Sequence, residues 1–303
     1  MHALEALKSE YETYLRHQRG LSERTIYHCW RFADRFMAFR FKGRKLDYGK
    51  VKPKDISDFM TQLVTRKVPF RDKTPPTHLR NFFRFLFYTG RTSVNLEPSV
   101  PRVAYGRGAH IPRYLPSEQV NRLLAALKKE TPLGRRNYAM ILLLARLGLR
   151  AEEVIRIQLE DIDWRAGEIL VRGKGKRCDK LPLPHDVGEA IARYVRHDRK
   201  TKARALFVTN RPPYEAFTDA QVLNGILESA FAETGIKPPS RYIGSHILRH
   251  SLATDMVAKG ASLDEVGDML RHRGRRSTMI YAKIDIEGLR SVARAWPKTG
   301  AVK

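Results

Sequence analysis

Residues 246–281 hold the densest collection of side chains that could do chemistry. His246, Arg249 and His250 fall on one predicted helix, and a run of basic residues follows at 271–276. Because residues three apart share a helix face, His246 and Arg249 can converge on one ligand. An imidazole and a guanidinium donating from the same face suit an oxyanion, and a phosphate above all.

Each of these residues also has a simpler interpretation. A His-x-x-Arg pair is often a solvated surface pair, and a lone tyrosine such as Tyr281 is often a packing residue. His246 and His250 have the spacing of a zinc pair, but no glutamate follows the first histidine and no cysteine cluster lies nearby. We therefore predict that the protein binds no metal.

Composition points to a folded protein with a polyanionic partner. Lys plus Arg number 57 against 32 Asp plus Glu, giving a formal charge of +25, while 42% of the 303 residues are hydrophobic. The basic residues are spread along the whole chain, with no separate amphipathic basic helix. This distribution favours nucleic acid over a membrane surface.

Targeting features and cysteine usage predict a reduced, cytoplasmic protein. The sequence contains no run of 18 apolar residues, and its acidic, amphipathic start differs from a signal peptide. Cys29 and Cys178 are too few and too isolated for a disulfide framework.

The sequence predicts two domains, which must position the candidate site residues. Four amphipathic helices fill residues 1–97, and a segment rich in proline, glycine and basic residues at 98–112 is a predicted linker. In residues 113–303, an apolar helix near 138–147 ends at Gly148, directly before Arg150. For Arg150 alone, a salt bridge to Glu153 or Asp161 is the simpler interpretation.

A break in the helical pattern follows at 161–184. Short β-rich runs alternate with turn residues and predict a small antiparallel meander, with Lys174 and Lys176 on a tip between glycines. This tip is either an ordinary charged hairpin or a mobile reactive group, and it lacks the spacing of a phosphate-binding P-loop. We predict no cofactor. Helical spacing at 284–296 predicts a last helix that docks on a neighbouring molecule.

Taken together, the ordered residues resemble the tyrosine recombinase (phage integrase) family. The matching segments are LGLRAEEV, GKGKR, HILRHSLAT and LRHRGRRSTMIYA, and the matched site residues are Arg150, Lys174, His246, Arg249, His272 and Tyr281. The resemblance covers the whole chain. It implies a mainly α fold with a small antiparallel sheet, in which an N-terminal helical core-binding (SAM-like) bundle precedes the catalytic domain.

The resemblance also implies partners and a reaction. We expect the protein to bind double-stranded DNA with an inverted-repeat core site. We also expect it to form a homo- or hetero-tetramer on two duplexes, with the subunits joined through the C-terminal tail. The reaction would be site-specific recombination through a 3′-phosphotyrosyl intermediate. It would serve integration or excision, transposition of a mobile element, or Xer-like resolution.

The residue types fit this chemistry on physical grounds. Two guanidinium forks, from Arg150 and Arg249, with His272 beside them, can stabilise the charge that develops on an attacked phosphate. A tyrosine with a pKa near 10 is only about 0.1% ionised at pH 7, so Tyr281 needs a base or relay, for which His246 is the candidate. Lys174 is the candidate acid for the leaving 5′ oxygen, with Lys176 as its rival.

The sequence departs from the family pattern at two positions. Arg271 stands where the family commonly has glycine, and Lys283 where it commonly has histidine, so Arg271 can change the turn that aims His272.

Two alternative functions stay open. A type IB topoisomerase has a similar active-site set, and a DNA-binding regulator could keep the fold without cutting. Supercoil relaxation without site preference would favour the first, and binding without strand cleavage the second.

Overall fold

The computed structural model describes residues 2–43, 45–65, 74–102, 112–173, 177–240 and 243–283. Much of the predicted linker, the tip with Lys174 and Lys176, and the predicted tail helix lie outside these residues. The chain divides into two compact units, Met1–Arg107 and Gly108–Lys303. The bounds of the predicted domains stay a prediction, although this division falls within 98–112.

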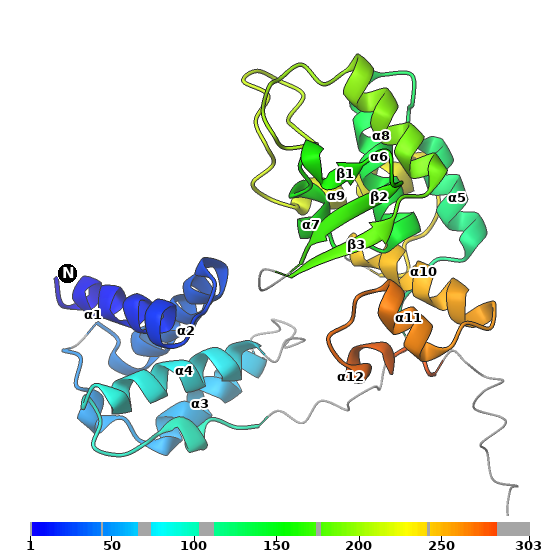
Figure 1. Ribbon diagram of the computed structural model, residues 1–303. Coiled ribbons are helices and arrows are strands. Elements are labelled where there is room, and N and C mark those ends of the chain that lie inside the picture. Colours follow the sequence, from blue (N-terminus) through cyan, green and yellow to red (C-terminus); the bar gives the residue numbers. More distant parts are fainter. Residues whose placement is uncertain are drawn as a thin grey trace, which may run out of the picture. The chain divides into compact units, whose positions relative to one another are not determined.

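The first unit is a helical bundle (Figure 1). Aromatic side chains fill its core, where Phe36 and Phe83 meet edge to face with ring centroids 5.1 Å apart. The predicted helical character of the N-terminal region is confirmed. Its elements are α1 (His2–Thr13), η1 (Tyr14–Gln18), α2 (Glu23–Phe41), η2 (Tyr48–Lys50), α3 (Pro53–Thr65), α4 (Thr74–Tyr88) and η3 (Glu97–Ser99).

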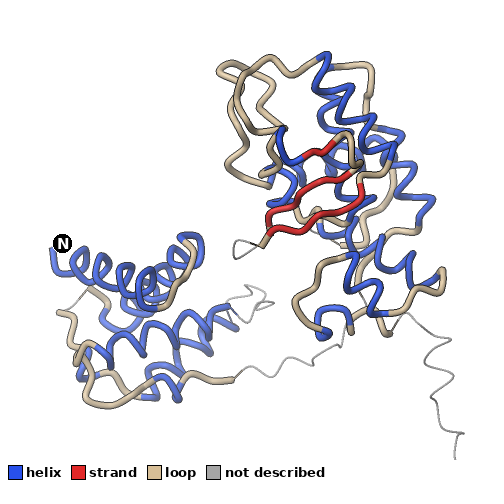
Figure 2. The backbone as a smooth tube through the Cα atoms, in the orientation of Figure 1, coloured by secondary structure: helices blue, strands red, loops and turns tan. Residues whose placement is uncertain are grey.

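The second unit combines a small sheet with helices (Figure 2). The prediction of a mainly helical fold with one small antiparallel sheet is confirmed. The elements are α5 (Ser117–Ala126), α6 (Pro132–Leu147), α7 (Ala151–Ile155), η4 (Leu159–Asp161), β1 (Ile162–Asp163), β2 (Glu168–Arg172), β3 (Cys178–Pro182), α8 (His185–His197), α9 (Gln221–Thr234), α10 (His246–Ala258), α11 (Leu263–Met269) and α12 (Arg275–Thr278).

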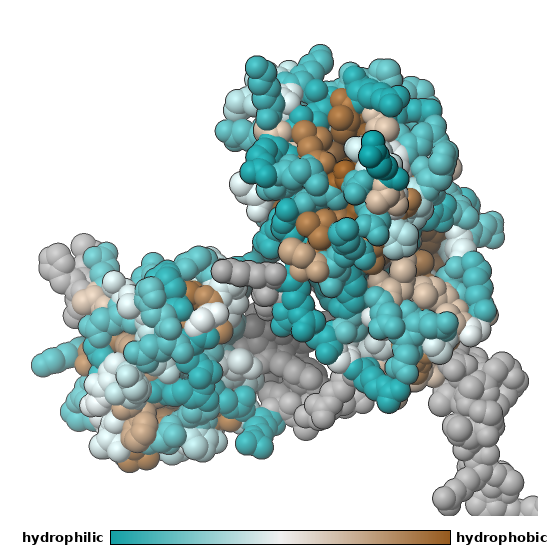
Figure 3. Space-filling view, in the orientation of Figure 1, coloured by the Kyte–Doolittle hydropathy of each residue, from teal (hydrophilic) through white to brown (hydrophobic). Residues whose placement is uncertain are grey.

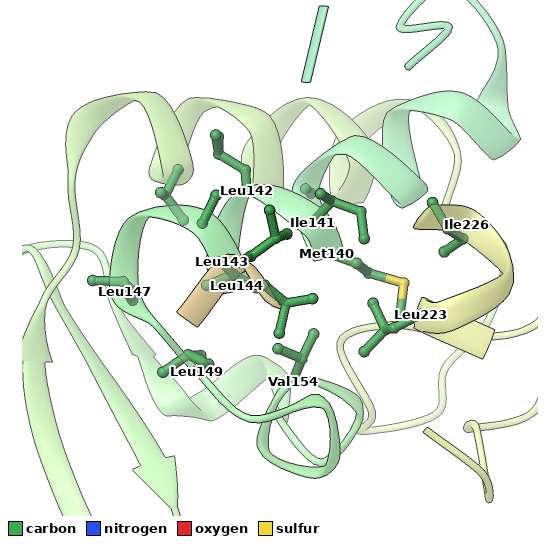
Figure 4. Packing of buried hydrophobic residues seen from close by; sticks show 14 of the residues in the cluster. Met140, Ile141, Leu142, Leu143, Leu144, Leu147, Leu149, Val154, Leu223 and Ile226 are labelled. Carbon is green, nitrogen blue, oxygen red and sulfur yellow. The ribbon is translucent and has the colours of Figure 1, made fainter. Parts of the chain in front are cut away.

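Helix α6 is the centre of the second core (Figure 4). Met140, Leu143 and Leu144 are fully buried, and α6 packs against α5, α8, α9 and α10. The helix begins before the predicted apolar stretch because the Thr131 hydroxyl accepts the Gly134 N–H at 3.0 Å, which caps a first turn that opens with proline.

The three strands form the predicted meander, in the order β1-β2-β3 with antiparallel pairing. Alternate residues of β2 are buried, so one face of the sheet packs on the core. The Gly173 N–H donates to the Arg177 carbonyl at 2.8 Å and closes the hairpin below its tip.

The visible face of the second unit is largely hydrophilic (Figure 3). Among the described helices, none combines the length and the apolar character that crossing a bilayer requires. The buried apolar residues instead gather in cores within each unit.

Candidate active site

Arg150 lies at the N-cap of α7, directly after the turn that ends α6. Gly148 makes this turn with a φ of +57°, and a side chain there would place its Cβ 2.7 Å from a Leu270 methyl carbon. The Arg150 side chain is 47% exposed, and its Nη1 donates to Glu153 Oε1 at 2.7 Å. The salt bridge therefore exists, yet it leaves most of the guanidinium N–H groups available for another ligand.

Glu153 is buried beneath this arginine, with 4% of its surface exposed. Its Oε2 accepts the Arg150 backbone N–H at 2.8 Å and Arg271 Nη2 at 2.7 Å. Burial acts to raise the pKa of the Glu153 carboxyl, but the Arg150 N–H and the charges of Arg271 and Arg150 bring the pKa below its ordinary value. Glu153 thus stays ionised between two guanidinium groups.

Arg249 is the buried guanidinium of the site, with 6% of its surface exposed. Nη1 donates to the carbonyl of Gly148 and Nη2 to that of Leu270, which ties α10 to the segments that carry Arg150 and His272. Burial, followed by the charges of Arg150 and Arg271, lowers the pKa of Arg249 to about 10. The positive charges of Arg150 and Arg271 thus lie close to Arg249, an arrangement that favours binding of an anion such as a phosphate.

His272 follows α11 and is held by a threonine that the sequence analysis did not single out. Its Nδ1 lies 2.8 Å from the hydroxyl of Thr278, and Thr278 packs against Gly267. Burial and the charges of Arg249 and Arg150 lower the pKa of His272 to about 4, so its ring is neutral at pH 7. A neutral, fixed imidazole keeps one N–H to donate.

Tyr281 lies in a small apolar cluster formed by α10, α11 and the segment after α12. It is 1% exposed and packs with Ala253, Val257, Val266 and Leu270. Its hydroxyl lies 2.7 Å from Nδ1 of His250. Burial raises the pKa of Tyr281 to about 12, opposed by the charge of Arg249.

The two histidines of α10 stand side by side. His246 is exposed, while burial and then the charges of His246 and Arg249 lower the pKa of the part-buried His250 to about 4. The two rings meet edge to face with centroids 5.6 Å apart. A side chain at Gly244 would place its Cβ 2.5 Å from the His246 ring, so glycine makes room for the ring there.

A cleft of about 410 Å³ opens beside these groups. Arg150 and His272 line it, whereas Tyr281 is buried, with its ring stacked on that of His272 at a centroid distance of 6.4 Å. Lys174 lies outside the described residues, but the ends of its hairpin, at Gly173 and Arg177, line this cleft. The structure therefore gathers five of the six predicted residues around one positively charged site.

Sequence reasoning gave no role to three residues that hold this site together. His250 appeared only as half of a possible zinc pair, Glu153 only as a salt-bridge partner, and Thr278 was not mentioned. The four-residue spacing of His246 and His250 was the one available signal for the first of them.

Both the sequence and the fold are similar to those of known proteins. The model of the phage integrase family matches residues 113–287. Putative integrase/recombinase y4rA of Sinorhizobium fredii (strain NBRC 101917 / NGR234) is 41% identical over 296 residues, covering 97% of this chain and 72% of that protein. Tyrosine recombinase XerC of Anoxybacillus flavithermus (strain DSM 21510 / WK1) is 30% identical over 293 residues, covering 92% and 93%.

Two solved structures with low sequence identity share the fold. XerH site-specific recombinase bound to palindromic difH substrate, in a post-cleavage complex, matches with a TM-score of 0.74 at 20% identity, covering 94% of this chain and 83% of that one. A lambda integrase dimer bound to a COC′ core site matches with a TM-score of 0.67 at 15% identity, covering 99% of both chains.

The family match and the similarity to curated recombinases thus define a DNA strand-transfer enzyme of the tyrosine recombinase class. The chain belongs to the phage integrase family, and it is a site-specific recombinase that cleaves and rejoins DNA.

Proposed function

We propose that Tyr281 cuts DNA by attacking a phosphodiester and forming a 3′-phosphotyrosyl link. The observation that carries this proposal is the gathering of Tyr281, His250 and Arg249 beside the cleft that Arg150 and His272 line. The Tyr281 oxygen bonds to phosphorus as the bond to the 5′ oxygen breaks. The new ester keeps the energy of the old bond, so religation requires neither metal nor nucleotide.

Three groups hold the phosphate in this proposal. Arg249 is anchored by two carbonyls and Arg150 by Glu153, so both forks are oriented before DNA arrives. With the Thr278 hydroxyl donating to Nδ1, the one N–H of His272 is on Nε2 and donates to a non-bridging oxygen. Fixed donors of this kind stabilise the charge that grows on the phosphate during attack.

Two protons must move in the reaction. Nδ1 of His250 accepts the phenolic proton from Tyr281. The exposed His246, whose ring contacts that of His250, then takes up a proton and releases it to solvent, as the relay expected for His246. Lys174, with Lys176 as its rival, gives a proton to the leaving 5′ oxygen. Because the Tyr281 hydroxyl is buried, DNA binding must also move the segment that carries it.

Replacing His250 with asparagine tests the proton transfer. The asparagine oxygen can accept the Tyr281 hydrogen bond but is not basic, so we expect cleavage to slow by about 10²-fold at pH 7. The rate should then rise with pH, as the phenol loses its proton directly. Single-turnover adduct formation between pH 6 and 9 measures this, with the exposed His197→Asn as control. Cleavage at the wild-type rate would assign His250 a packing role only.

We further propose that the enzyme acts as a homo- or hetero-tetramer on double-stranded DNA with an inverted-repeat core site, in the cytoplasm. The palindromic substrate of the XerH complex and the lambda integrase dimer on its core site support this arrangement. The predicted tail helix at 284–296, outside the described residues, would dock on a neighbouring catalytic domain.

Truncation after Lys283 tests the role of this tail. We expect the truncated chain to bind a single site with nearly unchanged affinity but to lose the four-subunit complex on two duplexes. Native gels and light scattering with labelled DNA follow both properties. Unchanged tetramer formation would exclude docking through the tail.

A nicked suicide substrate tests the proposed reaction itself. DNA flanking the chain's own gene is nicked beside candidate cleavage positions, so that the short 5′-hydroxyl fragment diffuses away and traps the covalent adduct. We expect a denaturant-resistant protein–DNA complex from the wild type. Tight binding with a steep salt dependence but no adduct on any such site would instead support a non-cleaving regulator.

A further inference from the structure

Arg271 occupies a backbone conformation that favours glycine. Its φ is +53°, in the left-handed region, at the turn between α11 and His272. The family pattern commonly has glycine at this position. A residue with a side chain is strained there, so other interactions of Arg271 must compensate for the conformation.

The Arg271 side chain is also buried, with 8% of its surface exposed. Nη2 donates to Glu153 at 2.7 Å, and Nε lies 3.8 Å from Asp179 on β3. Nη1 is buried with no hydrogen-bond partner among the described residues. A strained backbone and an unused buried donor both disfavour this arrangement, so stability alone does not explain it.

The partner of Arg271 is the carboxylate that holds Arg150. Glu153 receives Arg271 on one oxygen and Arg150 Nη1 on the other. Arg271 also directly precedes His272 in the chain. One ion pair therefore joins two phosphate-binding groups that come from segments more than a hundred residues apart.

We propose that Arg271 is a positioning residue that fixes Arg150 through Glu153 and sets the turn that aims His272. Its ion pair would hold Glu153, and thereby Arg150, in place, whereas a glycine at this position has no side chain to do so. The inference rests on the proposed roles of Arg150 and His272. It predicts that the chemical step depends on Arg271, although Arg271 itself does not contact the phosphate.

Arg271→Gly is the decisive variant, because glycine relieves the backbone strain and is the common residue of the family. We expect it to fold and to bind DNA within about twofold of wild type. Single-turnover adduct formation on the suicide substrate should fall by about 10²-fold, the scale of loss from a misplaced catalytic group. Arg271→Lys, which keeps a cation beside Glu153, should recover part of this rate.

A second background separates positioning from general damage. With Glu153→Gln already in place, Arg271→Gly should lower the rate little further, because the two residues act as one unit. The exposed Arg275→Ala, which breaks only the surface pair with Asp264, is the matched control and should cleave like wild type.

The outcomes are distinguishable. If the wild type forms an adduct and Arg271→Gly forms it equally fast, the positioning role is wrong while the proposed function stands. A full additional loss in the Glu153→Gln background would likewise overturn the coupling through Glu153. If the wild type itself forms no adduct on any cognate site, the proposed function fails, and the inference fails with it.

Discussion

Tyr281→Phe should abolish the covalent protein–DNA adduct, lowering its rate by on the order of 10⁴-fold or more. Phenylalanine fills the same apolar cluster but removes the oxygen that would bond to phosphorus. The affinity for DNA should stay within about twofold of wild type, because the hydroxyl is buried and bonds to His250 rather than to a surface group. Denaturing gels of the suicide-substrate reaction measure the adduct.

A second buried tyrosine provides the control for this variant. The Tyr194 hydroxyl accepts the Val208 N–H at 3.4 Å in the core of the same unit. Tyr194→Phe therefore also loses a hydroxyl hydrogen bond, but it should form the adduct at the wild-type rate. Equal adduct formation by Tyr281→Phe and wild type would exclude Tyr281 as the nucleophile.

Arg249→Ala should lower the single-turnover cleavage rate by about 10²–10³-fold, the usual loss when one oriented donor is removed. It should also lower the free energy of unfolding by about 1–3 kcal/mol, because the carbonyls of Gly148 and Leu270 lose their partner. Arg249→Lys keeps a charge but not the two-pronged contact, so its rate should recover only in part.

A variant of Arg136 separates the loss of cleavage from the loss of stability. It is another buried arginine of the same unit, also 6% exposed, and its Nη1 donates to the Val208 carbonyl at 2.8 Å. Arg136→Ala should lower the melting temperature as Arg249→Ala does, yet cleave at nearly the wild-type rate below that temperature. A comparable loss of cleavage in both variants would reduce Arg249 to a structural role.

The elements were predictable because their signals are local. The apolar repeat of α6, its glycine stop and the turn residues of the meander each lie within a short window of sequence. The first turn of α6 was missed because Pro132, Gly134 and Arg135 do not continue the apolar repeat, and a threonine cap defines the turn instead.

The candidate site was predictable as a set of residues but not as an arrangement. The order of Arg150, Arg249, His272 and Tyr281 follows from the family pattern. The structure brings these four side chains close enough for Arg249 to act electrostatically on the other three. The pairing of His250 with Tyr281 could not be read, because it depends on how α10 packs against α11 and the residues after α12. The burial of Tyr281 and the Arg271–Glu153 ion pair could not be predicted either, because both depend on tertiary packing.

Identifying the amino acid that carries the DNA tests the central claim most directly. The trapped adduct is digested with protease and nuclease, and the modified peptide is located by mass spectrometry. The account predicts one nucleotide-bearing residue, Tyr281, joined to a 3′ phosphate. A modification on any other residue, or attachment through a 5′ phosphate, would contradict it.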